Sequence, residues 1–248
     1  MGRNSGFIAM HSALSSCVAD LCLVPEVDFS LDGPGGIVEH LYERLVENDK
    51  AGKSSHCCFF LQHSIQTHTL LTASLTVVVI AEGAGQNLMK QMGATGEEVK
   101  DASGNVLLED VGPWLCKQLK KRLDDRLKQS SVYGDGLTLK YIDPSYMVRG
   151  IPPNTADNLY CLQLAQNAVH GAMAGFSSFI VGSINTRECY LPIELVVNKR
   201  NVIDTGHQSL WEYVVFSTGQ PSFQTNKDKR ESKDIITTAS GGVVMLAE

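Results

Sequence analysis

The sequence has 248 residues and a formal net charge of −6, with 43% apolar and 19% charged residues. This composition excludes collagen-like, coiled-coil and wholly disordered chains, and mild acidity gives no reason to expect nucleic-acid binding. No stretch approaches the roughly 18 consecutive apolar residues of a membrane span, so none is expected. The length predicts one large domain or two small ones. Seven cysteines, an odd number spread along the chain, indicate reduced, cytosolic-type usage rather than a disulfide framework.

The first part of the chain alternates predicted helices and buried strands. Apolar residues recur at helical spacing over residues 4–18 and again at every fourth position from Ile37 to Leu45, so each stretch is expected to form a helix. Residues 21–24 form a short apolar run that Pro25 stops, which predicts a buried strand. The continuous run of β-branched residues within 77–81 is typical of a central parallel strand.

The second part continues the same alternation. A helix is expected over residues 109–129, with Asp110 as a candidate N-cap, and a strand is expected over 137–142. The order of elements therefore predicts an α/β layer fold with a mainly parallel sheet.

Shorter elements follow. Asn154 is the expected N-cap of a long helix that ends near Ala174. Residues 179–182 and 189–193 are predicted to pair as strands around a turn, and residues 207–216 to form a short helix.

Two stretches do not fit this pattern. Residues 54–81 contain no Asp, Glu, Lys or Arg, and the part before the strand is too long for a normal connection of about 2–6 residues. The tail, residues 224–248, is rich in charge and is expected to be disordered.

The uncharged stretch contains Cys57, Cys58, His63 and His68, which raise the question of a zinc site. Adjacent cysteines are poorly placed for a tetrahedral clamp, and the histidine spacing is unlike that of zinc fingers. We therefore expect no metal site in this chain.

Three places in the sequence carry side chains that suit a sugar phosphate. Arg3 precedes the first helix, where a guanidinium and free N–H groups could hold an anion. Glu82 follows the 77–81 strand, and ligands of open α/β sheets bind beyond the carboxyl ends of strands. Lys140, Tyr146 and Arg149 lie in and after the next strand and suit a phosphate monoester. Each residue taken singly is better explained as an ordinary surface residue.

Two longer motifs, residues 141–149 and 165–175, closely resemble the phosphofructokinases, especially the plant-type and kinetoplastid-type ATP-dependent 6-phosphofructokinases. Supporting matches occur in family order at residues 1–7, 23–26, 80–86 and 100–105. The resemblance implies a three-layer, parallel-sheet phosphofructokinase fold, of which this chain is the C-terminal portion. It also implies a phosphofructokinase domain over residues 1–223, followed by the tail.

The resemblance assigns roles to the residues near the start of the chain and after the central strand. Met1 and Gly2 would contact the sugar phosphate of fructose 6-phosphate. Arg3 would be the catalytic residue, because it would stabilise charge on the transferring phosphoryl group, and it would also contact the substrate. Glu82 matches the carboxylate that binds sugar hydroxyls.

The resemblance also assigns the phosphate ligands of the substrate. Tyr146 and Arg149 match the pair that holds the phosphate, and Lys140 has the spacing of a further basic ligand. Phosphoryl transfer depends mainly on positioning and electrostatics, which this residue set could supply.

The sequence departs from the family in two ways. The Gly-Gly-Asp-Gly-Thr nucleotide loop and the Pro-Lys-Thr-Ile-Asp-Asn-Asp segment with the catalytic base do not occur. The main ligands of ATP and Mg²⁺ are therefore expected outside this chain, which should be inactive alone. Residues 52–74 look like an insertion, such as translated intron, and we expect them to have no role in the fold.

Other interpretations remain open. A pyrophosphate-dependent phosphofructokinase is one, since the absent loop largely selects the donor. A catalytically dead regulatory subunit that binds sugar phosphate is another. By resemblance the chain should form a homodimer or homotetramer in the cytoplasm, although a plastid location stays open because any targeting segment would precede Met1.

Overall fold

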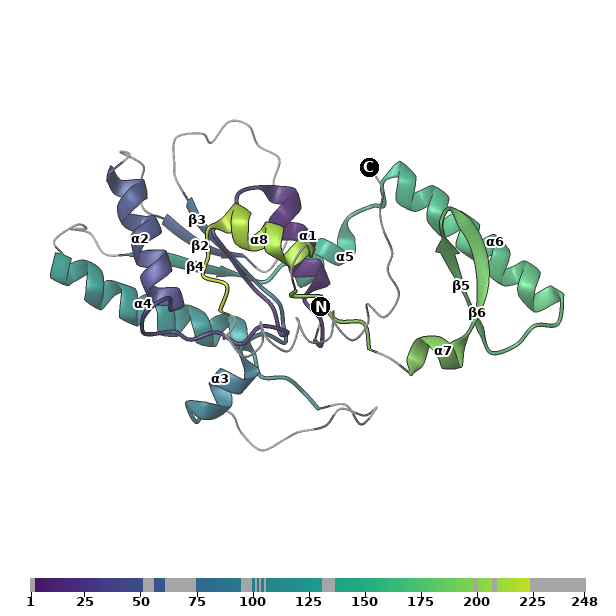
Figure 1. Ribbon diagram of the computed structural model, residues 1–248, viewed down its shortest axis with the longest axis horizontal. Helices are drawn as coiled ribbons and strands as arrows, with labels where there is room; N and C mark the ends of the chain where they lie inside the picture. The colour runs from purple at the N-terminus through teal and green to yellow at the C-terminus, as the bar shows by residue number, and fades with distance from the viewer. Residues whose placement is uncertain are drawn as a thin grey trace, which may run out of the picture. The chain divides into compact units, whose positions relative to one another are not determined.

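The computed structural model describes residues 3–50, 56–60, 75–94, 100, 102, 104, 106–130, 137–198, 200–206 and 209–223. The chain divides into two compact units (Figure 1). The first unit comprises Met1–Val148 and Val202–Glu248, and the second comprises Arg149–Asn201. The predicted disordered tail, 224–248, lies outside the described residues.

A four-stranded sheet forms the centre of the first unit. Its strands are β1 (Leu21–Leu23), β2 (His56–Phe60), β3 (Leu75–Ile80) and β4 (Thr138–Ile142), in the spatial order β1-β3-β2-β4. All three pairings are parallel, and Leu23 lies opposite Ile80 in the register. The parallel sheet was therefore predicted correctly, and the β-branched run forms an interior strand, as expected.

The strand β2 corrects one prediction. We expected residues 52–74 to have no role in the fold, yet residues 56–60 pair with strands on both sides, with Cys58 opposite Val77 and Lys140. The expectation is thus wrong for these five residues, because a short uncharged run ending in two aromatic residues satisfies the requirements of a strand. The remainder of the stretch lies outside the described residues.

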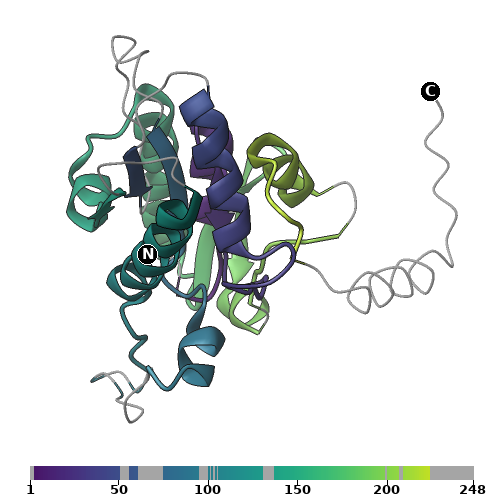
Figure 2. The ribbon, with the colours of Figure 1, turned by 90° about the vertical axis from the view of Figure 1, so that its left-hand side faces the viewer.

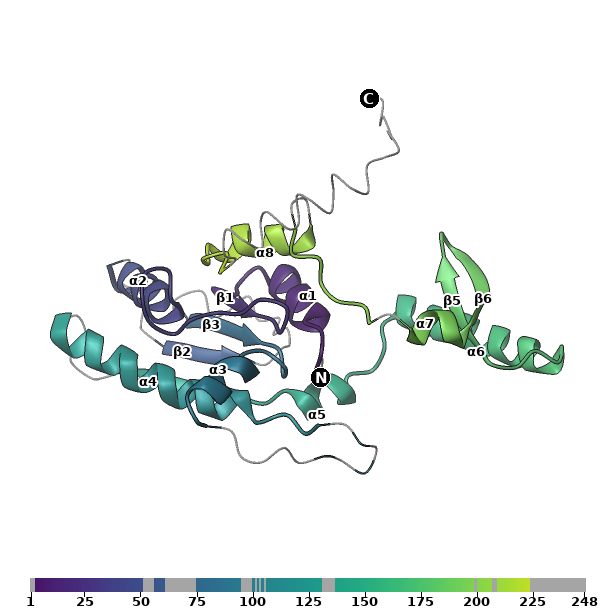
Figure 3. The same cartoon turned by 60° about the horizontal axis from the view of Figure 1, so that its bottom comes forward.

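Helices cover both faces of this sheet. They are α1 (Phe7–Ser16), α2 (Ile37–Lys50), α4 (Val111–Ser130) and α8 (Leu210–Thr218). α1 and α8 contact each other and β1, and Figure 3 shows them above the sheet with α4 below it. α2 and α4 lie side by side in Figures 1 and 2 and contact β3 and β4, respectively. The result is the layered α/β arrangement that the sequence predicts.

The apolar stripes of two helices form much of the core of this unit. Leu115, Leu119 and Leu123 of α4 are completely buried, as are Leu41 and Leu45 of α2. Each leucine buried in this way contributes about 1.5–3 kcal/mol relative to an exposed one. The periodicity of these two helices thus predicted the residues of the core as well as the helices.

The second unit consists of α6 (Thr155–Met173), a hairpin of β5 (Phe179–Ile184) and β6 (Arg187–Pro192), and the short α7 (Ile193–Val197). As predicted, Asn154 is the N-cap of α6. Its side-chain oxygen accepts a hydrogen bond of 2.9 Å from the Asp157 N–H.

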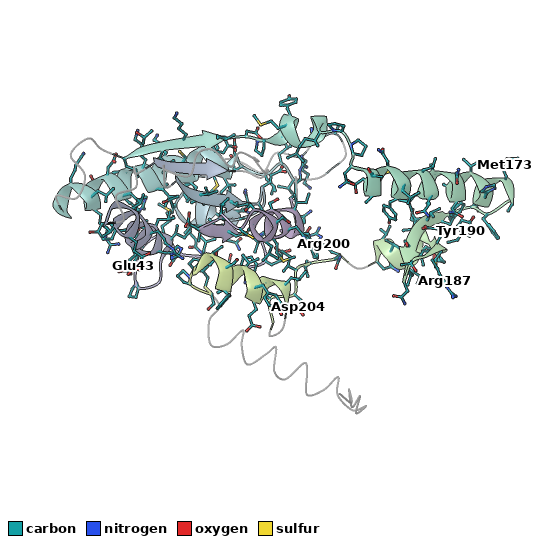
Figure 4. All side chains as sticks on the ribbon, turned by 90° about the horizontal axis from the view of Figure 1, so that it is seen from above. Glu43, Met173, Arg187, Tyr190, Arg200 and Asp204 are labelled. Carbon is teal, nitrogen blue, oxygen red and sulfur yellow. The ribbon has the colours of Figure 1, made fainter. Side chains whose placement is uncertain are left out.

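The hairpin packs closely on α6. The ring of Phe179 lies so near Gly171 that a Cβ there would be 2.6 Å from the ring. The Tyr190 hydroxyl donates a 3.0 Å hydrogen bond to the Asn167 carbonyl, and the Phe179 and Tyr190 rings meet edge to face (Figure 4 labels Tyr190). One face of α6 therefore packs against the hairpin.

None of the described helices is long and apolar enough to cross a bilayer.

Candidate functional site

The turn after β3 positions Glu82 at the carboxyl edge of the sheet. The Ala81 N–H donates to the Leu23 carbonyl at 2.9 Å, which extends the pairing of β3 with β1 by one residue. The Ala84 N–H then donates to the Ala81 carbonyl at 3.0 Å and closes a tight turn that leads into α3 (Gln86–Gln91). Because open α/β sheets bind ligands beyond the carboxyl ends of their strands, Glu82 occupies a position suited to a ligand.

An ion pair connects this turn with the start of the chain. The Arg3 Nε lies 3.4 Å from the Glu82 Oε1, and both side chains are partly exposed, at 43% and 35%. The backbones of the two segments also lie close together, since a Cβ on Gly83 would overlap the Arg3 carbonyl oxygen. The structure thus brings together two of the predicted site residues, while Met1 and Gly2 lie outside the described residues.

Glu26 anchors the segment that follows Arg3. Its two carboxylate oxygens accept hydrogen bonds of 3.0 and 3.1 Å from the Gly6 N–H, and Oε1 also accepts one of 3.1 Å from the Ile203 N–H. Charge-assisted bonds of this kind are stronger than neutral ones. We did not select Glu26 from the sequence, although its position directly after the strand-ending Pro25 was a signal.

Lys140 lies apart from the Arg3–Glu82 pair. It is exposed on β4, and its register partner on the intervening β2 is Cys58. Cys58 in turn lies opposite Val77 of β3. Strand spacings of about 4.8 Å and rises of about 3.3 Å per residue place its backbone roughly 10 Å across and 10 Å along the sheet from the end of β3. The register does not place Lys140 beside Glu82.

Tyr146 and Arg149 share the short helix α5 (Ser145–Gly150) after β4. The helix begins where the Ser145 N–H donates to the Asp143 carboxylate at 2.9 Å. Tyr146 is highly exposed, at 86%, and belongs to the first unit, whereas Arg149 is the first residue of the second. Arg149 therefore lies on α5 with Tyr146. Because the two units are described separately, its position relative to Arg3 is not given by the structure.

Titratable groups around β4 and β1 stay protonated at neutral pH. Burial, followed by the charges of Asp110 and Asp143, raises the pKa of Tyr141 to about 12. Burial, with a smaller contribution from Glu26, also raises the pKa of the Cys22 thiol to about 12. Neither group is therefore a nucleophile or a base near pH 7.

No metal site is formed by the residues that the structure describes: no three His, Cys, Asp or Glu side chains among them could hold an ion. Cys57 and Cys58 lie on β2, and His63 and His68 lie outside the described residues. We therefore assign no step to a metal among the described residues.

A separate cavity of about 520 Å³ lies between α2, α4 and the loop before α2. Arg122 on its wall pairs with Asp32, with Nε at 3.0 Å from Oδ2, and Arg126 pairs with Glu39 at 3.7 Å. Each arginine already has a carboxylate partner, so this cavity presents no excess positive charge to an anion.

Comparisons with known proteins agree on one family. The phosphofructokinase family model matches residues 1–172. From Arabidopsis thaliana, ATP-dependent 6-phosphofructokinase 1 is 40% identical over 236 residues (95% of this chain, 43% of the relative), and ATP-dependent 6-phosphofructokinase 4, chloroplastic, is 44% identical over 227 residues (92% and 37%). The ATP-dependent 6-phosphofructokinase of Borreliella burgdorferi is 38% identical over 226 residues (91% and 44%). The chain thus spans less than half the length of these relatives.

Proposed function

Because the chain belongs to the phosphofructokinase family, we propose that it supplies the sugar-phosphate-binding part of an ATP-dependent 6-phosphofructokinase. The proposed reaction transfers a phosphoryl group from ATP to the 1-hydroxyl of fructose 6-phosphate. The observation that carries the proposal is the Arg3–Glu82 ion pair at the carboxyl edge of the parallel sheet. It joins a cation that suits phosphoryl oxygens to a carboxylate that suits sugar hydroxyls.

The chemistry of the pair supports this assignment. An ionised carboxylate accepts hydrogen bonds only, so Glu82 would accept them from the hydroxyl groups of the sugar. A guanidinium has five N–H donors in a planar fork, so the contact with Glu82 is compatible with a second contact to a phosphoryl group. The ion pair would fix the orientation of Arg3 before the substrate arrives. Arg3 would then stabilise the charge that develops on the transferring group.

The phosphate of the substrate would be held by other residues. We propose that Tyr146 donates a hydrogen bond from its phenol and that Arg149 forms a bidentate contact. Lys140 stays in the proposal as a further basic ligand, which requires its side chain to extend toward the carboxyl edge. Met1 and Gly2 would contact the sugar phosphate beside Arg3.

The donor, the metal and the assembly are also proposals. ATP is the proposed donor because the relatives are named ATP-dependent. The residues that would hold ATP and Mg²⁺ are expected in the part of the family that this chain does not match, so this chain alone should transfer no phosphoryl group. A homo-oligomer and a cytoplasmic location remain predictions, with a plastid as the alternative because two Arabidopsis relatives are named chloroplastic.

Calorimetric titration of the full chain with fructose 6-phosphate tests the proposal. Glu82→Gln keeps the shape of the side chain but removes its charge, and Asp32→Asn is the matched control because it breaks another ion pair at a distance from the site. We expect Glu82→Gln to weaken binding about tenfold, because the glutamine oxygen still accepts, and a hydrogen bond to a charged group contributes about 1.5–3 kcal/mol against about 0.5–1.5 kcal/mol for a neutral one. Asp32→Asn should leave binding unchanged.

Two results would contradict the proposal. The wild-type chain could fail to bind fructose 6-phosphate, or both variants could weaken binding equally. A separate kinase assay tests the expected inactivity, and production of fructose 1,6-bisphosphate by the purified chain would contradict that part alone.

A further inference from the structure

The segment that carries Arg3 is held by the rest of the first unit at Arg3 itself and at Gly6. The Arg3 carbonyl lies so close to the turn after β3 that a Cβ on Gly83 would overlap it. The Gly6 N–H donates to both carboxylate oxygens of Glu26, at 3.0 and 3.1 Å. Three residues of extended chain span at most about 10 Å, so a fixed Gly6 limits the positions that Arg3 can reach.

The residues directly after β1 provide the support for this segment. Val24 is buried, and a Cβ on Gly6 would overlap its side chain. Pro25 lies beside the turn after β3, since a Cβ on Gly83 would be 3.4 Å from the Pro25 side chain. Because β1 is paired within the sheet, Glu26 projects from a part of the backbone that is held in place on both sides of the Arg3 segment.

The carboxylate of Glu26 also suits the start of α1. Gly6 is the N-cap residue of α1, and no side chain of the cap hydrogen-bonds the first turn. The first turn contains no acidic residue either. Because the N-terminus of a helix carries a partial positive charge, Glu26 supplies from another segment the negative charge that α1 lacks there.

Glu26 joins the Arg3 segment to a third part of the chain. Its Oε1 also accepts a hydrogen bond of 3.1 Å from the N–H of Ile203, which is buried. Val202, the residue before it, is where the chain returns to the first unit. One carboxylate thus pairs two backbone donors that lie 20 and 177 positions from it in the sequence. A shift of the carboxylate would weaken both contacts, so Glu26 is itself fixed in place.

We propose that Glu26 is a positioning residue, which holds the segment of Arg3 so that its guanidinium lies beside Glu82 for the sugar phosphate. The Arg3 Nε is 3.4 Å from the Glu82 Oε1, so a shift of about 1 Å would take the two atoms out of hydrogen-bonding range. The oxygens of Glu26 accept from backbone N–H groups, and Glu26 would act on the substrate through Arg3. The inference rests on the proposed function, because it concerns the same site.

Two variants at position 26 test the role by calorimetric titration of the full chain with fructose 6-phosphate. Glu26→Ala removes both acceptors and should weaken binding about tenfold, because the charged contact of Arg3 is misplaced. Glu26→Gln keeps one oxygen that can accept from Gly6 and Ile203, so it should restore binding to within about threefold of wild type.

Asp124→Ala is the matched control. The Asp124 carboxylate likewise accepts a hydrogen bond from a distant backbone N–H, that of Leu137, at 3.1 Å. Leu137 directly precedes β4, so this contact lies at the amino end of the parallel sheet, opposite the edge that carries Glu82. Asp124→Ala should leave binding unchanged even if it lowers the melting temperature.

A double-variant cycle separates positioning from a general loss of stability. If Glu26 acts through Arg3, Glu26→Ala should weaken binding less than about twofold once Arg3→Ala is present. Glu26→Asp, whose side chain is shorter by one methylene group, replaces Glu26→Ala in the cycle if the alanine variant does not fold. Losses that multiply in the double variant would overturn the proposal, and so would equal weakening by Glu26→Gln and Glu26→Ala.

Hydrogen exchange tests the anchoring without a ligand. The backbone amides of residues 4–6 should exchange faster in Glu26→Ala than in wild type, and at the wild-type rate in Asp124→Ala. A wild-type chain that binds fructose 6-phosphate, with unchanged exchange or unchanged affinity in Glu26→Ala, would overturn this inference alone. Failure of the wild-type chain to bind fructose 6-phosphate would overturn the proposed function and the inference with it.

Discussion

The side chain of Gln220 hydrogen-bonds both backbone groups of Cys22. Its Oε1 accepts from the Cys22 N–H at 2.7 Å, and its Nε2 donates to the Cys22 carbonyl at 3.1 Å. Cys22 is the middle residue of β1, which lies at the edge of the four-stranded sheet. The amide of Gln220 therefore occupies the place that the peptide group of a further strand would take. It hydrogen-bonds the backbone N–H and carbonyl of Cys22, which would otherwise be unpaired at the edge of the sheet.

Gln220→Ala should destabilise the first unit. Both Cys22 groups are buried, so loss of the amide leaves a donor and an acceptor unpaired, at a cost of about 1–3 kcal/mol each. Chemical denaturation measures the free energy of unfolding. Gln118→Ala is the control, because the Gln118 side-chain oxygen accepts a hydrogen bond from the partly exposed Arg122 side chain and not from a buried strand edge. Equal stability of the two variants would contradict the structural role of Gln220.

Truncations test the C-terminal boundary of the domain. Trp211 and Val214 of α8 are buried within the first unit, where α8 contacts α1 and β1, although they lie beyond the residues that the family model matches. Ending the chain after residue 223 should leave the melting temperature unchanged if the tail is disordered as predicted. Ending it after residue 206 should remove α8 and Gln220 and prevent cooperative unfolding. A large loss of stability on removing residues 224–248 would show that the tail is part of the fold.

The sequence predicted those parts of the structure that depend on local periodicity. The regularly spaced leucines of α4 predicted a helix and its buried face, and the β-branched run of β3 predicted a buried strand. Both predictions succeed because side chains that face a core are apolar and recur with the period of the helix or strand. The N-cap Asn154 was equally clear, since its hydrogen bond is made within one turn of helix.

The parts that could not be predicted depend on distant residues or on register. Gln220 and Cys22 are 198 positions apart, and periodicity carries no information about such a contact. β2 was missed because the length of the connection suggested an insertion, although five uncharged residues were enough for a strand. The rule for strand ends placed Glu82 at the carboxyl edge of the sheet, where the structure has it, and its role in binding stays a prediction. It said nothing of Arg3, which the structure brings to Glu82, or of Lys140, which the register separates from it.

Asp20 makes stability depend on pH. Its carboxylate accepts a 2.8 Å hydrogen bond from the Val77 N–H, while its carbonyl accepts one of 2.8 Å from His40. Burial raises the pKa of Asp20 above 3.8, against the smaller lowering effects of the Val77 N–H and the charges of Arg44 and His40. The native state therefore holds the Asp20 proton more tightly than the unfolded state does.

Asp20→Asn isolates this effect. A raised pKa in the folded state means that the Asp20 contribution to stability falls as pH rises from 3.8 through the folded pKa. The asparagine has no such dependence and can still accept from Val77. Relative to wild type, Asp20→Asn should therefore be most favourable at neutral pH, and its advantage should shrink as pH falls toward 3.8. Urea denaturation over that range measures the difference, and an advantage that grows on acidification would reverse the inferred direction of the shift.

Gly83→Ala tests whether the backbone contact at the candidate site matters for binding. A Cβ at Gly83 would overlap the Arg3 carbonyl oxygen, so the segment around Arg3 or the turn after β3 must move. Gly182→Ala is the control, because a Cβ there meets only the end of the Leu191 side chain, at 3.4 Å, within the β5–β6 hairpin.

The displacement should separate the Arg3 guanidinium from Glu82 and weaken fructose 6-phosphate binding by about tenfold, as expected when a charge-assisted contact is misplaced. The main body of the first unit should keep its fold, because the atoms nearest to a Cβ at Gly83 belong to Arg3 and Pro25 and not to the buried leucines of α2 and α4. Calorimetry measures the binding, and far-ultraviolet circular dichroism measures the helical content of each variant. If Gly83→Ala binds fructose 6-phosphate as well as Gly182→Ala does, the close approach of Arg3 to the turn is a feature of the fold alone, and Arg3 and Glu82 need not act together.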